Sequence, residues 1–460
     1  MDALRTLARL DFERWAIRRG SKSDGIAGEG DAVKRLKDKL AKALAAERET
    51  LQNLAKNSGA KVVDKTTVEQ IVHGAHGIKS LICDTSSVPP DKGLIIRGQP
   101  ISALADKLPE EIYWLLLTGQ LPDKEDLAAL QAELSARAEL PGYVWKVLDQ
   151  MPSDAHAMCL LNTGILCMER ESVFRKRYEE KMAKDGFGDA TFEDALTLMA
   201  RVPVLAAGIY RRKFKKAEPI APNPKLDWGA NYAHMLGIAD PKGEFAQLLR
   251  LYLVLHCDHE SGNVSAMTAT TVNSALSDLY YALAAGFNGL AGPLHGLANQ
   301  ECLTWVLNLM KRHGGMPTVD QIKKEAEETI AAKRVIPGYG HGVLRVIDPR
   351  FESFVAFGRT RCANDPVFQT VLRVFEAVPA VLKQYPKIKN PCPNVDAASG
   401  SLLYHYGLTD QDYYTVLFAV GRTMGITAQC TVARGLMLPI VRPTSVTSGW
   451  LIEAAKTAKE

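Results

Sequence analysis

The sequence has no pair of cysteines spaced as Cys-x-x-Cys and no low-complexity tract. Its 8 cysteines are widely scattered, which excludes a zinc ribbon and a dense disulfide framework and favours a reducing compartment. No apolar run approaches the roughly 18 residues that span a bilayer, so we expect no membrane insertion. The net charge is only +4, which argues against wholesale nucleic-acid binding. The partners that we expect are small molecules.

What the sequence does have is length and the composition of an ordinary folded protein, with 47% hydrophobic and 23% charged residues. A chain of 460 residues exceeds the size at which one core keeps growing, so we expect two domains, or one large domain with an insertion. The first twenty residues carry five arginines and regularly spaced leucines. Residues 1–30 are therefore predicted to be a transit peptide or an N-terminal surface helix; Asp2, Asp11 and Glu13 count against the first.

Helical patterns dominate the rest of the chain. Residues 31–56 predict an exposed amphipathic helix, and residues 121–142 predict one that is capped by Asp123 and ends at Pro141-Gly142. The only β signal is at 81–98, where two short apolar runs flank a Pro-Asp-Lys-Gly turn and predict a small hairpin at most. The predicted fold class is all-α. Further helices are expected at 191–214, 244–256, 267–286, 301–313, 318–332, 366–385 and 411–437.

The stretch HCDHESGN, residues 256–263, contains His256, Asp258, His259 and Glu260. Its spacing is not the i, i+4 pattern of HExxH zinc sites and no third ligand is evident, so a metal site is the weakest interpretation. A buried, hydrogen-bonded histidine is the second interpretation. The third is a neutral imidazole that holds an anionic or carbonyl-bearing substrate.

His295 lies in the glycine-rich turn NGLAGPLHG, just before a predicted helix. The positive end of that helix would lower the pKa of the imidazole and favour the neutral ring. A neutral imidazole N–H can stabilise a developing enolate. The alternative is a tight turn between helices with no chemical role.

A second histidine, His341, lies in PGYGHGVLRVIDPR, residues 337–350, together with Arg345 and Arg350. The glycines imitate a dinucleotide motif only superficially, because no strand precedes them and the last spacing is wrong. They would instead let the backbone approach a ligand. Arg350 follows a proline and could present its guanidinium to a carboxylate, or it could be a solvated side chain. We expect this segment to be a mobile loop.

Asp396, in NPCPNVDAASG, is the only carboxylate between Ala377 and Tyr406. Burial would raise its pKa and make it a stronger base, whereas the alternative is an aspartate that caps the following helix. Upstream, Lys387 and Lys389 could meet phosphates.

Together, GPLHG (292–296), PGYGH (337–341) and PNVDA (393–397) resemble the motifs of the citrate synthase family, in its eukaryotic mitochondrial type. The stretches at 250–266, 413–422 and 438–443 also look like their family counterparts, and the likeness runs from about residue 60 to the C-terminus. It implies an acyltransferase of the tricarboxylic acid cycle, which condenses acetyl-CoA with oxaloacetate and hydrolyses the thioester to citrate and CoA.

The resemblance also implies roles for residues. His295 would hydrogen-bond the thioester carbonyl, Asp396 would take the methyl proton and His341 would protonate the ketone of oxaloacetate. Oxaloacetate would be bound by His259, Arg350, Arg422 and, from the other subunit of a homodimer, Arg442. CoA would be bound by Arg345, Lys387, Lys389 and Lys176.

By the same likeness, residues 31–295 and 402–460 would form a large helical domain and residues 296–401 a smaller inserted helical domain, with the active site in the cleft between them. The two would close on substrate and exclude water. No metal or other cofactor is expected, since acetyl-CoA is a substrate, and the expected location is the mitochondrial matrix.

The sequence departs from the family pattern at four places. His76 and Lys176 stand where arginines are common, and Met267 and Ala398 stand where histidines are common. The changes at Met267 and Ala398 leave the acyl group that the pocket accepts undetermined, so a 2-methylcitrate synthase that uses propionyl-CoA is the near alternative. A non-catalytic, helical acyl-CoA-binding protein and a metallohydrolase built on HCDHE are the rivals from other classes.

Overall fold

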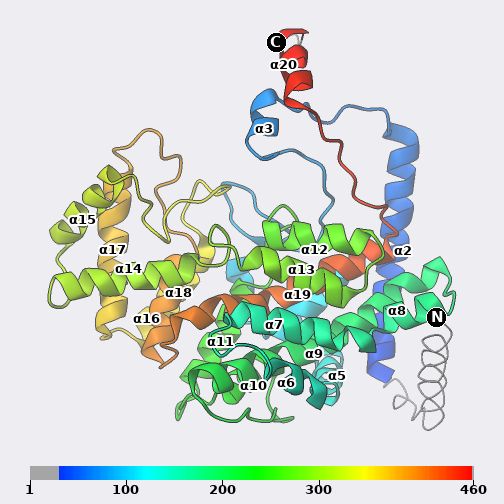
Figure 1. The fold of residues 1–460 in the computed structure, drawn as a ribbon, viewed down its shortest axis with the longest axis horizontal. Coiled ribbons are helices and arrows are strands. Elements are labelled where there is room, and N and C mark those ends of the chain that lie inside the picture. Colours follow the sequence, from blue (N-terminus) through cyan, green and yellow to red (C-terminus); the bar gives the residue numbers. More distant parts are fainter. Residues whose placement is uncertain (1–30, 458–460) are drawn as a thin grey trace, which may run out of the picture.

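The computed structural model describes residues 31–457, so the prediction for residues 1–30 lies outside them. Within that range the protein is built almost entirely of helices, which confirms the all-α prediction (Figure 1). The α-helices are α2 (Asp31–Ser58), α3 (Val68–Val72), α4 (Pro109–Thr118), α5 (Lys124–Ala136), α6 (Gly142–Leu148), α7 (Ala157–Cys167), α8 (Val173–Glu179), α9 (Phe187–Ile209), α10 (Trp228–Leu236), α11 (Glu244–Leu255), α12 (Val264–Ser274), α13 (Leu279–Leu290), α14 (Ala298–Arg312), α15 (Val319–Ala331), α16 (Pro349–Arg361), α17 (Pro366–Leu382), α18 (Asp396–His405), α19 (Tyr414–Gly435) and α20 (Ser448–Thr457). Short 3-10 turns are η1 (Ile101–Leu104), η2 (Met168–Glu171), η3 (Lys184–Gly186) and η5 (Gln411–Tyr413), and η4 (Tyr210–Phe214) is a π-helical turn that continues α9.

The larger part of the molecule surrounds α19, which packs against α9, α12, α4, α13 and α11. This helix is almost wholly buried. The segment Gln411–Gly435 is long and apolar enough to cross a membrane, contrary to the expectation that no such run exists, but 89% of its apolar window is buried inside the protein. Its apolar surface is therefore used for packing between helices.

Helices α14 to α18 gather at one side of the molecule (Figure 1). Three of them, α14, α15 and α17, share a second hydrophobic cluster, which includes Leu309, Ile322, Val374 and Val378 and is separate from the main core. These helices fall within the predicted insertion at 296–401. A core of their own is what an inserted unit needs for its own stability, although the boundary residues stay a prediction.

The predicted hairpin is small, as expected. Strand β1 (Ser86–Ser87) pairs with β2 (Ile95–Ile96), which pairs with β3 (Gln99–Pro100), and both pairings are antiparallel. The turn before β2 closes when Gly93 N donates to Pro89 O at 3.1 Å, with Gly93 at φ 81°. A side chain at Gly93 would collide with Pro349, so this turn lies directly against the first residue of α16.

Most predicted helices form, and two predictions need correction. The helix expected at 267–286 is two helices, because the chain turns at Leu276 (φ 63°) and Asp278 caps α13 by accepting from Tyr280 N and Tyr281 N. The helix expected at 121–142 is capped by Asp123 as predicted but ends earlier, at Ala136.

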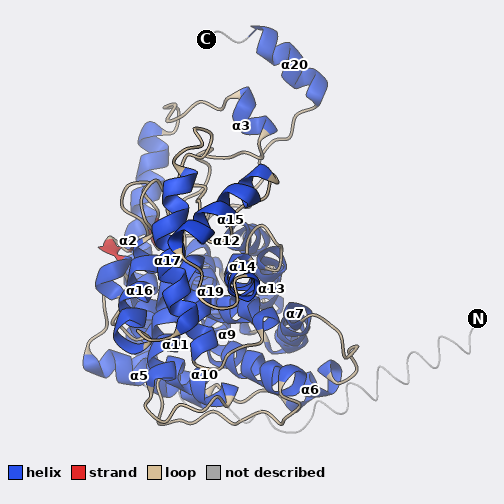
Figure 2. Ribbon diagram, turned by 90° about the vertical axis from the view of Figure 1, so that its left-hand side faces the viewer, coloured by secondary structure: helices blue, strands red, loops and turns tan. Residues whose placement is uncertain are grey.

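Two segments extend away from the body of the protein. They are residues 59–82, which include α3, and the C-terminal segment that ends in α20 (Figures 1 and 2). Both expose large apolar side chains: Val62 and Val63 are 80% and 84% exposed, and Trp450 and Ile452 are 56% and 57% exposed. Apolar side chains held so far from the core are typical of segments that contact another chain.

Candidate active site

The three predicted catalytic residues lie on loops and helix ends around two buried arginines. His295 follows α13, His341 lies between α15 and α16, and Asp396 is the first residue of α18. Arg350 and Arg422 both act on the charge state of Asp396, while Arg422 acts on His295 and Arg350 on His341. The fold therefore brings together side chains that are far apart in the sequence.

His295 is held by the first turn of α12. The backbone N–H of Ser265 donates to Nε2 of His295 at 3.3 Å, and Ser265 Oγ lies 2.9 Å from the same atom. A backbone N–H can only donate, so Nε2 is the acceptor and the proton of the neutral ring is on Nδ1. Burial, and then the nearby Arg422, lowers the pKa of His295 to about 4. The expected neutral ring is supported, but by these causes and by the start of α12 instead of the start of α14.

His341 is fixed by its own loop. Its Nδ1 accepts from the backbone N–H groups of Val343 and Leu344, each at 3.0 Å. The proton of the neutral ring is therefore on Nε2, which is left to donate to another group. Burial, and then Arg350, lowers the pKa of His341 to about 4.

Asp396 has the raised pKa that a general base at neutral pH needs. Burial raises the pKa of its carboxyl to about 6, against the opposing effect of Arg350. The alternative role as a helix cap is not what the structure shows, because Asp396 lies inside α18 and the N-cap position, Val395, has no side-chain cap bond. Its own backbone N–H donates to Asn394 Oδ1 at 3.0 Å.

Arg350 is buried and paired with Asp348. Its Nε and Nη2 donate to the two carboxylate oxygens at 3.0 Å and 2.7 Å. Burial alone would raise the pKa of Asp348, but the Arg350 guanidinium offsets this and holds that pKa below its ordinary value. Asp348 also caps α16 by accepting from Arg350 N. The carboxylate thus fixes the direction of the guanidinium, whose Nη1 has no bond to Asp348.

Arg422, on α19, is the second buried cation. Its Nη1 lies 3.2 Å from Asn263 Oδ1 and 3.4 Å from Ser265 Oγ, and its guanidinium lies over the ring of Phe418 at 4.8 Å. Burial lowers the pKa of Arg422 to about 10; Asp258 opposes this and Arg350 adds to it. Two desolvated cations at one place form a site for a dianion.

The histidines of HCDHE have distinct surroundings. His256 Nδ1 donates to Tyr252 O at 2.8 Å, and its ring stacks on Tyr252. Nε2 of His259 is buried without a hydrogen-bond partner, and the His259 and His341 rings are 5.5 Å apart. Burial, and then Arg350, holds the pKa of His259 well below its ordinary value. Nε2 of His256 is likewise buried without a partner, so it is the position of the His259 ring beside His341 that favours His259 as the ring that binds a ligand.

Asp258 is occupied by three protein donors. Its carboxylate accepts from Thr85 Oγ1 at 2.6 Å, Ser86 Oγ at 2.8 Å and Gln429 Nε2 at 2.6 Å. Across residues 31–457, no three His, Cys, Asp or Glu side chains form a group that could hold a metal ion. Asp258 therefore anchors the HCDHE stretch to β1 and α19.

The loop that carries His341 is bonded to its surroundings at several points, and its mobility stays a prediction. Gly340 N donates to Cys392 O at 3.0 Å, Asn394 N donates to Gly338 O at 2.9 Å, and Arg345 N donates to Pro90 O at 2.8 Å. A Cβ on Gly338, at φ 82°, would lie 2.9 Å from Cys302 Sγ. The glycines here allow close backbone packing against the segment that leads to Asp396.

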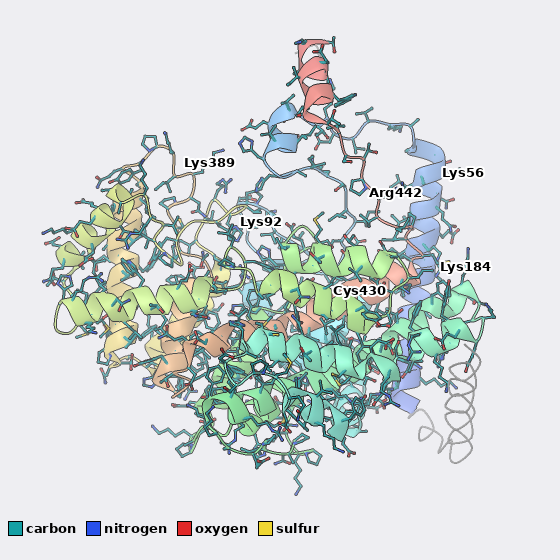
Figure 3. All side chains as sticks on the ribbon, viewed as in Figure 1. Lys56, Lys92, Lys184, Lys389, Cys430 and Arg442 are labelled. Atoms are coloured by element: carbon teal, nitrogen blue, oxygen red, sulfur yellow. The ribbon has the colours of Figure 1, made fainter. Side chains whose placement is uncertain are left out.

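The predicted CoA-binding residues are brought together only in part. Arg345, Lys387 and Lys389 are exposed on the same group of helices and loops, although Nη1 of Arg345 donates to backbone carbonyls, including Val343 O at 2.9 Å. Helix α8, which carries Lys176, lies on the other side of the molecule from Lys389 (Figures 1 and 3). Within one chain, α8 is therefore separated from the segment that carries Lys389.

Arg442 is likewise apart from the other oxaloacetate-binding candidates. It is exposed on the segment that leads to α20, and it lines a cavity of about 470 Å³ with Ser261 and residues of α12 (Figure 3). Met267, one of the departures, lines the same cavity, whereas Ala398 is fully buried in the main core. His76 lies close to the His341 loop, with Nε2 3.8 Å from a Cβ placed on Gly342.

Three residues of the site were missed from the sequence. Ser265 and Asn263 could have been found from the Asn-x-Ser start of a helix, and Asp348 from its spacing of two residues before Arg350. None of these patterns shows what the side chain contacts across the fold.

Comparisons with known proteins agree with this geometry. The family profile "Citrate synthase, C-terminal domain" matches residues 74–444. "Citrate synthase 4, mitochondrial" from Arabidopsis thaliana is 44% identical over 433 residues, 92% of this chain and 91% of the relative. "Citrate synthase, mitochondrial" from Neurospora crassa is 42% identical over 431 residues, 92% of each chain.

Among solved structures, the citrate synthase from Pyrobaculum aerophilum has a TM-score of 0.72 and 28% identity, and it covers 82% of this chain and 92% of its own. The mitochondrial names of the plant and fungal relatives indicate a mitochondrial protein. The chain belongs to the citrate synthase family, and its activity is that of an acyltransferase that forms citrate.

Proposed function

We propose that this chain condenses acetyl-CoA with oxaloacetate at the site formed by His295, His341 and Asp396, and then hydrolyses the citryl thioester to citrate and CoA. The observation that carries the proposal is the pair of neutral histidines with opposite tautomers, which share the buried Arg350 and Arg422 with a carboxyl of raised pKa. This set can supply one base and two N–H donors without any change of protonation before substrate binds.

The first step is enolisation of acetyl-CoA. The Asp396 carboxylate takes a proton from the methyl carbon, and the electron pair moves toward the thioester oxygen. Nδ1–H of His295 donates a hydrogen bond to that oxygen, where negative charge develops. The α-proton of a thioester is a weak acid in water, so this stabilisation of the enol is the main contribution that the site must make.

The second step joins the carbon atoms. The enol carbon attacks the ketone carbon of oxaloacetate, and Nε2–H of His341 gives its proton to the ketone oxygen, which becomes the hydroxyl of citrate. The carboxylates of oxaloacetate bind Arg350 and Arg422, and His259 Nε2 supplies a further contact. Water then hydrolyses the thioester.

The functional unit that we propose is a homodimer. Arg442 and Lys176 lie away from the rest of their proposed sites within one chain, as residues that serve the partner's site would. The exposed apolar side chains of residues 59–82 and of α20 supply surface for such an interface. The location that we propose is the mitochondrial matrix, and the reaction as written requires neither a metal nor another cofactor.

The test is an assay of thiol release from acetyl-CoA and from propionyl-CoA, each with and without oxaloacetate. We expect release that depends on oxaloacetate, is faster with acetyl-CoA, and is lost in Asp396→Ala and His341→Ala. Asp123→Ala, which removes only the cap of α5, is the matched control and should stay active. Absence of oxaloacetate-dependent release with both thioesters would refute the proposal, and a preference for propionyl-CoA would reassign the substrate.

A further inference from the structure

The segment 390–394 lies between the His341 loop and Asp396 and has an asparagine at each end. Asn390 Nδ2 donates to Leu344 O at 2.8 Å, and Asn394 Nδ2 donates to Gly340 O at 3.1 Å. Gly340 directly precedes His341 and Leu344 follows it three residues later. The two amides therefore hold the loop on both sides of the histidine.

The same two side chains also shape the segment that carries Asp396. Asn394 Oδ1 accepts from Asp396 N at 3.0 Å, and Asn390 Oδ1 accepts from Cys392 N at 2.9 Å. Each asparagine thus closes a local turn with its oxygen and reaches the His341 loop with its nitrogen. An antiparallel bridge between Tyr339 and Pro393 completes the connection.

We propose that Asn390 and Asn394 are positioning residues that join His341 and Asp396 into one rigid unit, so that the ketone donor and the methyl base keep their mutual geometry. The inference rests on the proposed function. It goes beyond it by assigning roles to two residues outside the proposed catalytic and substrate-binding set. We call these two asparagines the clamp. Misplacement of a catalytic group by about 1 Å can cost about 100-fold in rate, so loss of the clamp should have a measurable kinetic effect.

The two half-reactions allow the clamp to be tested apart from folding. Enolisation uses His295 and Asp396 and can be followed as exchange of the methyl protons of acetyl-CoA with D₂O, with malate in place of oxaloacetate. Malate has a hydroxyl where oxaloacetate has its ketone, so no condensation follows. Condensation additionally needs His341 and is followed as thiol release.

Asn390→Ser is the main variant, since its hydroxyl can still accept from Cys392 N but cannot reach Leu344 O. We expect kcat for thiol release to fall by about 10- to 100-fold, with methyl exchange within about twofold of the unaltered protein. Asn390→Asp keeps the local acceptor and places an oxygen against Leu344 O. It should likewise lower thiol release and leave methyl exchange nearly unchanged, and it replaces the serine variant if that variant does not fold. Asn223→Ala is the matched control, because it removes an equivalent turn bond, to Lys225 N at 3.0 Å, outside the site.

Asn394→Ala removes the bond to Asp396 N as well, so both half-reactions should fall. The clamp is refuted if Asn390→Ser and Asn390→Asp leave thiol release unchanged, or if they lower exchange and release equally. If the unaltered protein shows neither methyl exchange nor thiol release, the proposed function itself is refuted.

Discussion

Ser265 holds His295 through two atoms, because its backbone N–H and its hydroxyl both face Nε2 of the imidazole, at 3.3 Å and 2.9 Å. The first contact is set by the fold of α12 and survives any substitution at Ser265 except proline, which has no backbone N–H. The hydroxyl contact does not. The serine side chain therefore offers a way to loosen the histidine while its tautomer is kept.

For Ser265→Ala we expect kcat to fall by about 10-fold, since a net hydrogen bond of about 1 to 1.5 kcal/mol is lost from a group that acts on the thioester. The KM for oxaloacetate should rise by a smaller factor, because the same hydroxyl also lies 3.4 Å from Arg422 Nη1. Steady-state kinetics with both substrates varied will measure this. Thr50→Ala, which removes an exposed hydroxyl that donates to Ala46 O on α2, serves as the control. A larger change in the KM for oxaloacetate than in kcat would contradict the assigned role.

The pH profile should report Asp396. The carboxyl must be ionised to act as base, and its pKa is about 6, so kcat/KM for acetyl-CoA should be level above that pH and fall about tenfold per unit below it. His295 and His341 have pKa values of about 4 and stay neutral over this range. Rates measured from about pH 5 to 8 test this, and a profile that remains flat down to pH 5 would rule out Asp396 as the titrating base.

Removal of the charge of Asp348 should destabilise the empty protein. Asp348→Asn leaves the Arg350 guanidinium buried without its carboxylate, which typically costs about 3 to 5 kcal/mol. Oxaloacetate would return negative charge to the same cation. We therefore expect a larger rise in melting temperature with oxaloacetate for the variant than for the unaltered protein, measured by calorimetry.

Asp227→Asn is a closely matched control for that experiment. Asp227 also caps a helix and pairs with an arginine through two bonds, to Arg250, but this pair is partly exposed and remote from the site. Asp227→Asn should lose less stability than Asp348→Asn. Oxaloacetate should raise its melting temperature no more than it raises that of the unaltered protein. Equal stabilisation by oxaloacetate in both variants would show that the ligand does not bind at Arg350.

A shared site can be tested by mixing subunits. Asp396→Ala and Arg442→Ala should each be nearly inactive as homodimers, whereas a mixed dimer contains one site with both residues intact. Co-expression should restore about a quarter of full activity, since about half of random dimers are mixed and one of their two sites is complete. No recovery in purified mixed dimers would place Arg442 within its own subunit's site, whereas an active Arg442→Ala homodimer would place it outside catalysis.

Much of this site could be predicted from the sequence because its reactive residues stand in short, glycine- and proline-rich motifs. The raised pKa of Asp396 was expected from burial, and the neutral state of His295 was expected as well, although from the wrong helix. The position of the proton on each imidazole ring follows from the hydrogen bonds that the ring accepts. Only for His341 do these bonds come from residues nearby in the sequence. His341 is bonded to residues 2 and 3 positions away, but Ser265 is 30 positions from His295.

The fold was predicted in class but not in detail. The break between α12 and α13 has no glycine or proline to mark it, and only the capping Asp278 indicates a new start. The His341 loop was predicted to be mobile because it is rich in glycine. Its partners are Pro90 and the segment 390–394, and contacts at such separations leave no trace in local composition.

The two buried arginines have a consequence for the way in which a dianion would bind. On the predicted boundaries, Arg350 belongs to the inserted domain and Arg422 to the large one, and each disfavours the charge on the other. With no anion between them, the repulsion of the two guanidinium groups is offset only by nearby carboxylates, chiefly Asp348 for Arg350 and Asp258 for Arg422. On the proposed function, a bound dianion would be attracted to both cations, so we expect oxaloacetate to draw the two parts of the site together.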